Sequence, residues 1–197
     1  MALQLTLHGT DARSIDSQAV FERRPLDGTS WLDVARGWLH GADTLACELV
    51  SRVPWRQGRR RMWDRMVDDP RLSYRSLSGG APVHPAFTAL GAALADHYGR
   101  PLRGPALNYY RDGRDSVAPH ADRELRDLGD TLIAIVTLGA RRPFLVRPKS
   151  GGRSLDLAPG SGDLLVMGGA TQLGFTHAVP KVAHAGPRIS LSWRWHR

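Results

Sequence analysis

The spacing of apolar residues changes character near Gly99, about halfway along the chain. Before that point, apolar side chains recur at helical intervals over residues 40–51 and again over residues 85–98, which predicts a helix in each segment. Residues 1–30 follow neither the helical nor the strand period, and they predict an extended arm or a first pair of strands.

Short apolar runs separated by Gly, Pro and Asp fill the chain after Gly99. Such runs predict short β-strands. The expected strands are 106–110, 117–120, 131–138, 143–147, 154–157, 163–167, 175–178 and 188–195. Strands of this number and spacing are typical of a sandwich or a double-sheet jelly roll. We therefore predict an α+β fold with an all-β second half, and N-terminal helices packed on one outer face of its sheet.

The length and composition are those of one soluble globular domain. The chain has 197 residues, of which 42% are hydrophobic and 23% charged, so disordered and collagen-like classes are excluded. Its single cysteine, Cys47, rules out an intramolecular disulfide and a cysteine-built zinc or iron–sulfur site. No apolar stretch is long enough to span a membrane, and residues 1–20 lack the pattern of a signal peptide. We expect a cytoplasmic monomer with no membrane partner.

The chain is strongly basic, with 27 Lys and Arg residues against 19 Asp and Glu and a net charge of +8. Nearly all of these cations are Arg, which resembles the coding bias of a GC-rich genome, but such a bias does not explain the excess over acids. Segment 52–75 is the most basic part, with eight Arg against three Asp, and it contains Trp55, Trp63 and Tyr74. It is compatible with a nucleic-acid partner and equally with a solvated surface.

Two histidines and an aspartate form the first chemically informative pattern. His120 and Asp122 are two residues apart, the spacing at which side chains in a strand point to the same side. His177 lies in another predicted strand. Two His and one carboxylate make the facial triad that holds non-heme Fe(II) and leaves positions open for oxygen and a co-substrate. A surface ion pair between His120 and Asp122 is the alternative at this point.

A pair of arginines near the C-terminus forms the second pattern. Arg188 and Arg194 are six residues apart in a predicted strand, and they project to one face together with Ser190. Two guanidiniums on an inward face are costly unless they meet an anion, and a carboxylate suits their geometry. The same period-two argument places the amide of Asn108 beside the phenol of Tyr110. Iron and a dicarboxylate co-substrate account for the whole polar set.

Three stretches of sequence carry these residues: LNYYRDGRDSVAPHAD at 107–122, GGATQ and HAVPK within 168–181, and PRISLSWR at 187–194. Together they resemble the AlkB family of Fe(II)- and 2-oxoglutarate-dependent dioxygenases, over roughly residues 50–197. The resemblance implies a double-stranded β-helix core and the oxidative demethylation of N-alkylated bases in DNA or RNA. It also implies Fe(II), 2-oxoglutarate and O2 as cofactors, with formaldehyde, succinate and CO2 as products.

The resemblance also implies roles for individual residues. Iron would be bound by His120, Asp122 and His177. The co-substrate 2-oxoglutarate would be bound by Asn108, Tyr110, Arg188, Ser190 and Arg194. Within that set, Arg188 would pair with the distal carboxylate, and Arg194 would lie near the inner end of the co-substrate as a catalytic residue. Many members have Asn where this chain has Ser190, whose side chain is shorter.

The substrate contacts implied by the resemblance are less specific. Glu124 falls where the family has an acidic residue facing the base, as a catalytic or substrate-binding group, and a solvated loop carboxylate is the alternative. Segment 52–75 falls where the family has its nucleotide-recognition lid. In that segment Trp63 and Tyr74 are candidates to stack on a flipped base, each with a core position as the alternative. The candidates to hold phosphates are Arg59, Arg60 and Arg61.

The expected organisation is one globular domain in three parts. Residues 1–51 are expected to form an N-terminal extension and the first helix, residues 52–100 the nucleotide-recognition lid and a support helix, and residues 101–197 the jelly-roll core. The alternative function is the same chemistry on a protein or small-molecule substrate. A binding module without turnover is a third reading, which the complete set of metal and co-substrate residues disfavours. The basic segment 52–75 favours a nucleic-acid substrate over the alternative.

Overall fold

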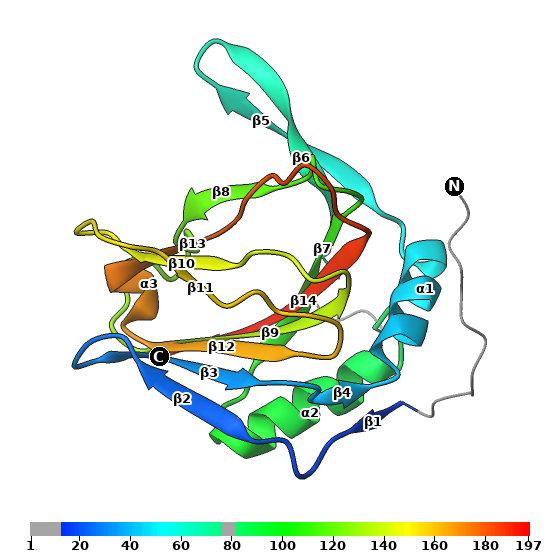
Figure 1. Ribbon diagram of the computed structural model, residues 1–197, viewed down its shortest axis with the longest axis vertical. Helices are drawn as coiled ribbons and strands as arrows, with labels where there is room; N and C mark the ends of the chain where they lie inside the picture. The colour runs from blue at the N-terminus through cyan, green and yellow to red at the C-terminus, as the bar shows by residue number, and fades with distance from the viewer. Residues whose placement is uncertain (1–12, 76–81) are drawn as a thin grey trace.

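Two antiparallel β-sheets face each other across the middle of the molecule (Figure 1). They are seen in a computed structural model that describes residues 13–75 and 82–197. The larger sheet has eight strands, in the order β2 (Phe21–Pro25), β3 (Ser30–Ala35), β12 (Leu164–Gly169), β9 (Thr131–Gly139), β14 (Arg188–His196), β7 (Arg103–Tyr110), β6 (Arg65–Arg75) and β5 (Arg56–Met62). The smaller sheet has four, in the order β11 (Leu155–Asp156), β10 (Leu145–Pro148), β13 (Phe175–Val179) and β8 (Val117–His120). A separate ribbon pairs β1 (Ser14–Ile15) with β4 (Leu39–His40).

Strand β9 shows how alternating side chains build the core on both faces of the larger sheet. All of its residues from 131 to 138 are buried, and successive side chains point to opposite faces. Ile133 and Ile135 pack in the hydrophobic cluster between the two sheets. Ala134 and Val136 belong to a second cluster on the outer face. A strand that is buried on both faces needs a cover on each side.

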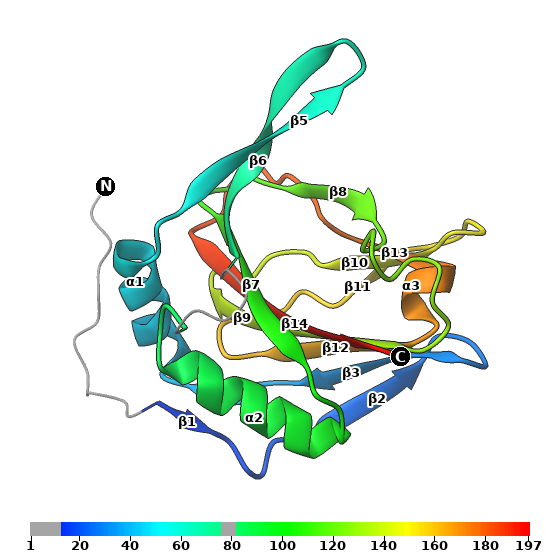
Figure 2. The ribbon, with the colours of Figure 1, turned by 180° about the vertical axis from the view of Figure 1, so that it is seen from behind.

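Helices α1 (Ala42–Arg52) and α2 (Ala86–Tyr98) lie along the outer face of the larger sheet (Figure 2). Leu49 of α1 and Leu94 of α2 are buried in the same outer cluster as the outward side chains of β9. Both helices begin and end within two residues of the bounds that the apolar spacing predicts. A short third helix, α3 (Thr171–Gly174), immediately precedes β13. Within residues 13–75 and 82–197, no helix has the length and apolar character needed to cross a membrane.

The N-terminal segment, for which the sequence predicted an extended arm or a first pair of strands, takes part in the larger sheet through β2 and β3. Strand β3 lies between β2 and β12, and no strand was predicted there because Ser30 and Asp33 interrupt its apolar pattern. Both residues are buried. The Asp33 carboxylate accepts hydrogen bonds from the Arg23 guanidinium at 2.8 Å and from the Tyr98 hydroxyl at 3.0 Å. With these partners a carboxylate is tolerated inside a buried strand.

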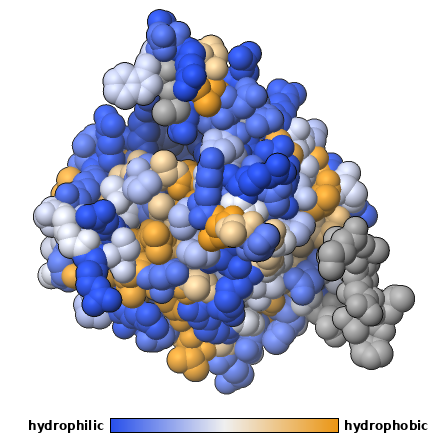
Figure 3. Space-filling view, turned by 45° about the horizontal axis from the view of Figure 1, so that its top comes forward, coloured by the Kyte–Doolittle hydropathy of each residue, from blue (hydrophilic) through white to orange (hydrophobic). Residues whose placement is uncertain are grey.

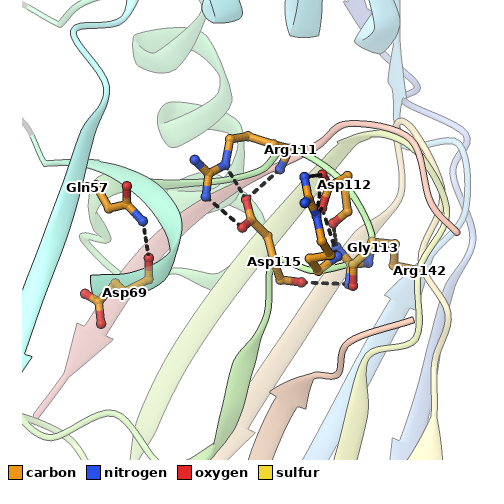
Figure 4. Close-up of polar contacts among 8 residues, drawn as sticks. Gln57, Asp69, Arg111, Asp112, Gly113, Asp115 and Arg142 are labelled. Atoms are coloured by element: carbon orange, nitrogen blue, oxygen red, sulfur yellow. Dashed lines mark hydrogen bonds and ion pairs between the residues drawn. The ribbon is translucent and has the colours of Figure 1, made fainter. Parts of the chain in front are cut away.

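Strands β5 and β6 form a long hairpin that projects beyond both sheets (Figures 1 and 3). The base of the hairpin belongs to the larger sheet, because residues 72–75 of β6 pair with residues 106–109 of β7. The chain reverses at Trp63, which has a left-handed φ of 57° and is 92% exposed. Near the base, the Gln57 amide donates to the Asp69 carbonyl at 3.0 Å and bridges the two strands (Figure 4). The predicted lid segment is therefore a two-stranded arm continuous with the larger sheet.

Candidate active site

Three side chains with metal-binding atoms meet at the edge of the smaller sheet. His120 ends β8 directly opposite His177 of β13, and the centroids of their rings are 4.3 Å apart. Asp122 follows two residues later, with its Oδ1 at 3.6 Å from His120 Nε2 and 3.9 Å from His177 Nε2. One possible ligand atom from each residue lies within 4.8 Å of the other two. The structure thus brings the three predicted ligands together, and a set of two imidazoles and one carboxylate fits Fe(II).

Hydrogen bonds and burial prepare these groups to bind a cation. His120 Nδ1 donates to the Ala118 carbonyl at 2.9 Å, so Nε2 is the ring nitrogen left for a metal. Burial and the nearby charge of His120 lower the pKa of His177 to about 3, which keeps its imidazole neutral. Burial raises the pKa of Asp122, but contact with His120 and the charge of Arg194 outweigh it and hold this pKa well below its ordinary value. Arg194 Nε donates to Asp122 Oδ2 at 2.6 Å, so Oδ1 is the oxygen that faces the histidines.

The guanidinium of Arg188 is buried beside the ring of Tyr110. Arg188 is 1% exposed, and the only hydrogen bond of its side chain among the described residues is from Nη2 to Thr137 Oγ1 at 3.3 Å, which leaves Nε and Nη1 without a partner. Burial lowers the pKa of Arg188 to about 10, so it remains charged at neutral pH. Burial raises the pKa of the Tyr110 hydroxyl, which remains a donor. A buried cation with unpaired N–H groups fits a carboxylate ligand.

The metal ligands and most of the predicted co-substrate residues line one cavity of about 380 Å³ between the sheets. Ser190 of β14 stands in register with Asn108 of β7, and both line this cavity. Arg71 of β6 also reaches it, where its Nε donates to Asn108 Oδ1 at 2.9 Å and its Nη1 is buried without a partner among the described residues. Arg71 was not among the predicted site residues, because nothing in the sequence reveals that β6 pairs with β7.

Glu124 and Trp63, both predicted to meet the substrate, are exposed. Glu124 lines the mouth of the cavity, with its Oε1 at 3.9 Å from Arg75 Nη1. Trp63 lies at the turn of the β5–β6 hairpin and does not line the cavity. Figure 3 shows hydrophilic side chains over most of the hairpin and a recess beneath it. Both positions are open to a large ligand.

The arginines of β5 differ in how far their charge is balanced. Arg59 Nε lies 3.1 Å from an Asp68 carboxylate oxygen, and Arg60 Nε lies 3.4 Å from an Asp69 oxygen. Arg61 is exposed and forms no ion pair within the described residues. The positive charge that Arg59, Arg60 and Arg61 offer is therefore smaller than their number suggests.

Tyr74 does not reach the cavity, which corrects its predicted role as a base-stacking residue. Ser73 and Arg75, its neighbours in β6, both line the cavity, so the period of the strand turns Tyr74 to the opposite face. There Tyr74 packs against the outer hydrophobic cluster and lines a separate pocket with Phe87 of α2. Tyr74 therefore has the core position that the sequence analysis gave as its alternative role.

A second buried arginine, Arg142, braces the loop that follows β7 (Figure 4). It donates to the carbonyls of Asp112 and Asp115 at 2.8 Å, and within the loop Arg111 pairs with the Asp115 carboxylate at 2.8 Å. The Arg142 guanidinium also lies 5.6 Å from the centroid of the Tyr110 ring. These contacts fix the chain directly after the strand that carries Asn108 and Tyr110.

The chain is similar to known oxygenases in sequence and in fold. Residues 78–194 match the family described as the 2OG-Fe(II) oxygenase superfamily. The chain is 28% identical over 215 residues to the human alpha-ketoglutarate-dependent dioxygenase alkB homolog 3, covering 97% of this chain and 75% of that protein. It is 37% identical over 187 residues to the Arabidopsis thaliana DNA oxidative demethylase ALKBH2, covering 74% of this chain and 59% of that protein. A solved prolyl hydroxylase from Trichoplax adhaerens, in complex with a peptide fragment of hypoxia inducible factor, covers 84% of this chain and 83% of its own with a TM-score of 0.63. At 13% identity, this last likeness shows the fold alone.

Proposed function

The chain belongs to the 2OG-Fe(II) oxygenase superfamily, and from that premise we propose that it oxidatively demethylates N-alkylated bases in DNA or RNA. It is a dioxygenase that depends on Fe(II), 2-oxoglutarate and O2. The observation that carries the proposal is one cavity lined by His120, Asp122 and His177 and by residues of the basic β5–β6 hairpin. The substrate class is supported by the names of two relatives, alkB homolog 3 and DNA oxidative demethylase.

Three side chains would hold the iron: His120, Asp122 and His177. When bound, the iron supplies the activation of O2 that oxidises an N-methyl group, which then leaves as formaldehyde. The neutral imidazole of His177 and the ionised Asp122 are ready to bind without losing a proton. Arg194 holds Asp122 Oδ2 and thereby turns Oδ1 toward the histidines.

The co-substrate would be bound at the wall formed by β7 and β14. We assign its distal carboxylate to Arg188, whose buried guanidinium has Nε and Nη1 without a partner among the described residues and so offers N–H donors to an anion. The Tyr110 hydroxyl and the Asn108 amide would add hydrogen bonds, with Arg71 fixing the Asn108 carbonyl oxygen. Ser190 is small and leaves room beside Asn108.

The nucleic acid would lie across the mouth of the cavity, under the hairpin. A base inside a duplex cannot reach such a cavity, so the target is single-stranded or flipped out of the stack. Trp63 offers an exposed aromatic face, and Glu124 lies at the mouth where it can accept hydrogen bonds from a base. The phosphates would be held by Arg59, Arg60 and Arg61, of which Arg61 is free of an acidic partner within the described residues.

A panel of methylated oligonucleotides tests this function. The protein is incubated with Fe(II), 2-oxoglutarate and O2, together with single- and double-stranded DNA and RNA that carry 1-methyladenine or 3-methylcytosine. We expect mass spectrometry to show the unmethylated base, with one formaldehyde and one succinate formed per methyl group lost. Asp122→Ala is the inactive control. Parallel reactions contain methylated peptides and methylated small molecules, and turnover confined to those would overturn the nucleic-acid proposal.

A further inference from the structure

Gln172 contacts the metal centre from outside. It lies in α3 and is 1% exposed. Its side-chain Oε1 accepts a hydrogen bond from the backbone N–H of Asp122 at 2.8 Å. Its Nε2 lies 3.9 Å from the sulfur of Met167, a weak acceptor. Gln172 is thus a fully buried amide whose strong contact is to the backbone of a proposed metal ligand.

The contact of Gln172 with Asp122 links two segments that are far apart in the chain. Asp122 lies beyond the end of β8, so its N–H is not held by the strand ladder, and 50 residues separate it from Gln172. On the other side, Gln172 is followed within a few residues by β13, which carries His177. Lys149 Nζ donates to the Gln172 carbonyl at 2.9 Å and fastens the short helix to the end of β10. One buried side chain therefore joins the two segments that supply ligands.

We propose that Gln172 is a positioning residue for the metal centre, which holds the backbone of Asp122 at a fixed distance from His177 before any metal binds. This inference rests on the proposed function, because it takes the three residues as metal ligands. Gln172 is not one of the three proposed ligands, and it does not line the substrate cavity. Groups that orient ligands in this way typically change metal affinity by about 10- to 100-fold when removed. Because Arg194 still holds the Asp122 carboxylate, we expect a partial loss.

The decisive variant is Gln172→Met, which keeps the length of the side chain and removes the amide oxygen. Two quantities are measured on the full chain after removal of metal: the hydrogen-exchange rate of the Asp122 N–H, followed by NMR, and the affinity for Mn(II), followed by electron paramagnetic resonance. We expect the Asp122 N–H to exchange at least about 10-fold faster and the Kd for Mn(II) to rise by about 10- to 100-fold. The matched control is Gln57→Met on the hairpin, which removes an amide that bonds the Asp69 carbonyl and should change neither quantity.

Three outcomes separate this inference from the proposed function. If the wild type binds Mn(II) through Asp122, as judged by loss in Asp122→Ala, and Gln172→Met changes neither quantity, the positioning role is wrong and the function stands. If the wild type shows no Asp122-dependent Mn(II) binding, the metal site itself is wrong. If Gln172→Met does not fold, Gln172→Glu decides, because it retains an acceptor oxygen. It should keep the Asp122 N–H protected to within about threefold of the wild type, and a loss of 10-fold or more would overturn the inference.

Discussion

The co-substrate residues and the metal ligands are held in place differently, because they lie on different sheets. Asn108, Tyr110, Arg188 and Ser190 lie on β7 and β14 of the larger sheet. Strand β14 pairs with β9 along its whole length, and it pairs with β7 in unbroken register over residues 188–192. Backbone hydrogen bonds on both sides therefore set the positions of Arg188 and Ser190.

Among the metal ligands, His177 lies on β13 between β10 and β8, whereas Asp122 depends much more on side-chain contacts. Strand β8 has four residues, and it pairs with β13 at His120 and Val117 with an irregularity between these positions. Asp122 lies outside the strand, where Arg194 holds its carboxylate and Gln172 its N–H. A site on a central strand is fixed by the ladder, whereas a site beyond a strand end is fixed by a few specific contacts. Single substitutions should therefore disturb metal binding more than co-substrate binding.

The largest effect is expected from Asp122→Ala. This change removes a ligand and leaves Arg194 without its carboxylate partner. Succinate formation should fall below detection and Mn(II) binding should be lost, while circular dichroism shows that the fold is kept. Normal turnover by this variant would refute the facial-triad assignment.

Arg188→Lys should have the next largest effect, and it tests the co-substrate side of the comparison. The backbone position is set by the ladder, so the change replaces only the planar guanidinium, with its several fixed N–H donors, by a single ammonium. A hydrogen bond to a charged group contributes about 1.5–3 kcal/mol, so the KM for 2-oxoglutarate should rise by about 10- to 100-fold. Mn(II) affinity should stay at the wild-type value. An unchanged KM would show that Arg188 does not bind the co-substrate.

Three arginines of the hairpin, Arg59, Arg60 and Arg61, do not line the cavity, so their charges should affect the binding of the nucleic acid alone. Each phosphate neutralised contributes about 0.7–0.9 to the slope of log affinity against log salt concentration. Replacing Arg59, Arg60 and Arg61 together by Ala should reduce the slope by less than about three, because two of these arginines already pair with Asp68 and Asp69. Arg61→Ala should account for most of the change. Binding of a methylated oligonucleotide at several salt concentrations measures it, and an unaltered slope would mean that these side chains are simply solvated.

Acid should lower the free energy of unfolding of the metal-free protein, because His177 of the smaller sheet is buried in its neutral form. The pKa of His177 is about 3 in the folded chain, below its ordinary value of 6.5, so the unfolded chain takes up a proton first as the pH falls. The free energy of unfolding should therefore be highest above pH 6.5 and decline toward pH 3, with a slope of up to about 1.4 kcal/mol per pH unit from this residue. Urea unfolding in the presence of a chelator measures this slope. His177→Gln should flatten it, and an identical slope in that variant would assign the acid sensitivity elsewhere.

The smallest effect is expected from Ser190→Asn. The position is fixed by pairing with both Asn108 and Thr137, and the longer amide can reach the co-substrate wall that Ser190 leaves open. The KM for 2-oxoglutarate should be unchanged or slightly lower. A large increase would indicate that the space beside Asn108 is needed for the co-substrate itself.

Much of the architecture could be predicted from the spacing of apolar residues along the chain. Most of the site could be predicted from the two-residue alternation of side chains in strands, combined with the family resemblance. The predicted enzyme class and cofactors are confirmed by the family match. The convergence of His120 and Asp122 could be predicted because both belong to one short segment. The roles assigned to individual residues stay predictions until the variants are measured.

The features that the sequence did not reveal depend on contacts between distant segments. Strand β3 was missed because its buried Asp33 is paired with Arg23 and Tyr98, and only the fold shows that pairing. The sequence left Tyr74 open between base stacking and a core position, because the face that it occupies is set by the pairing of β6 with β7. Gln172 meets Asp122 across 50 residues, and no local pattern marks such a contact.

The projecting hairpin has a consequence for how this enzyme can change over time. Among the described side chains from 56 to 69, none belongs to either hydrophobic cluster. Substitutions there remove no core packing and should cost little stability, whereas those on β9 or β14 would. Mutation can therefore explore the length, charge and tip of the hairpin while the oxidation chemistry remains constant. Substrate preference is the part of this protein most open to evolutionary change, and the iron site is the part least open to it.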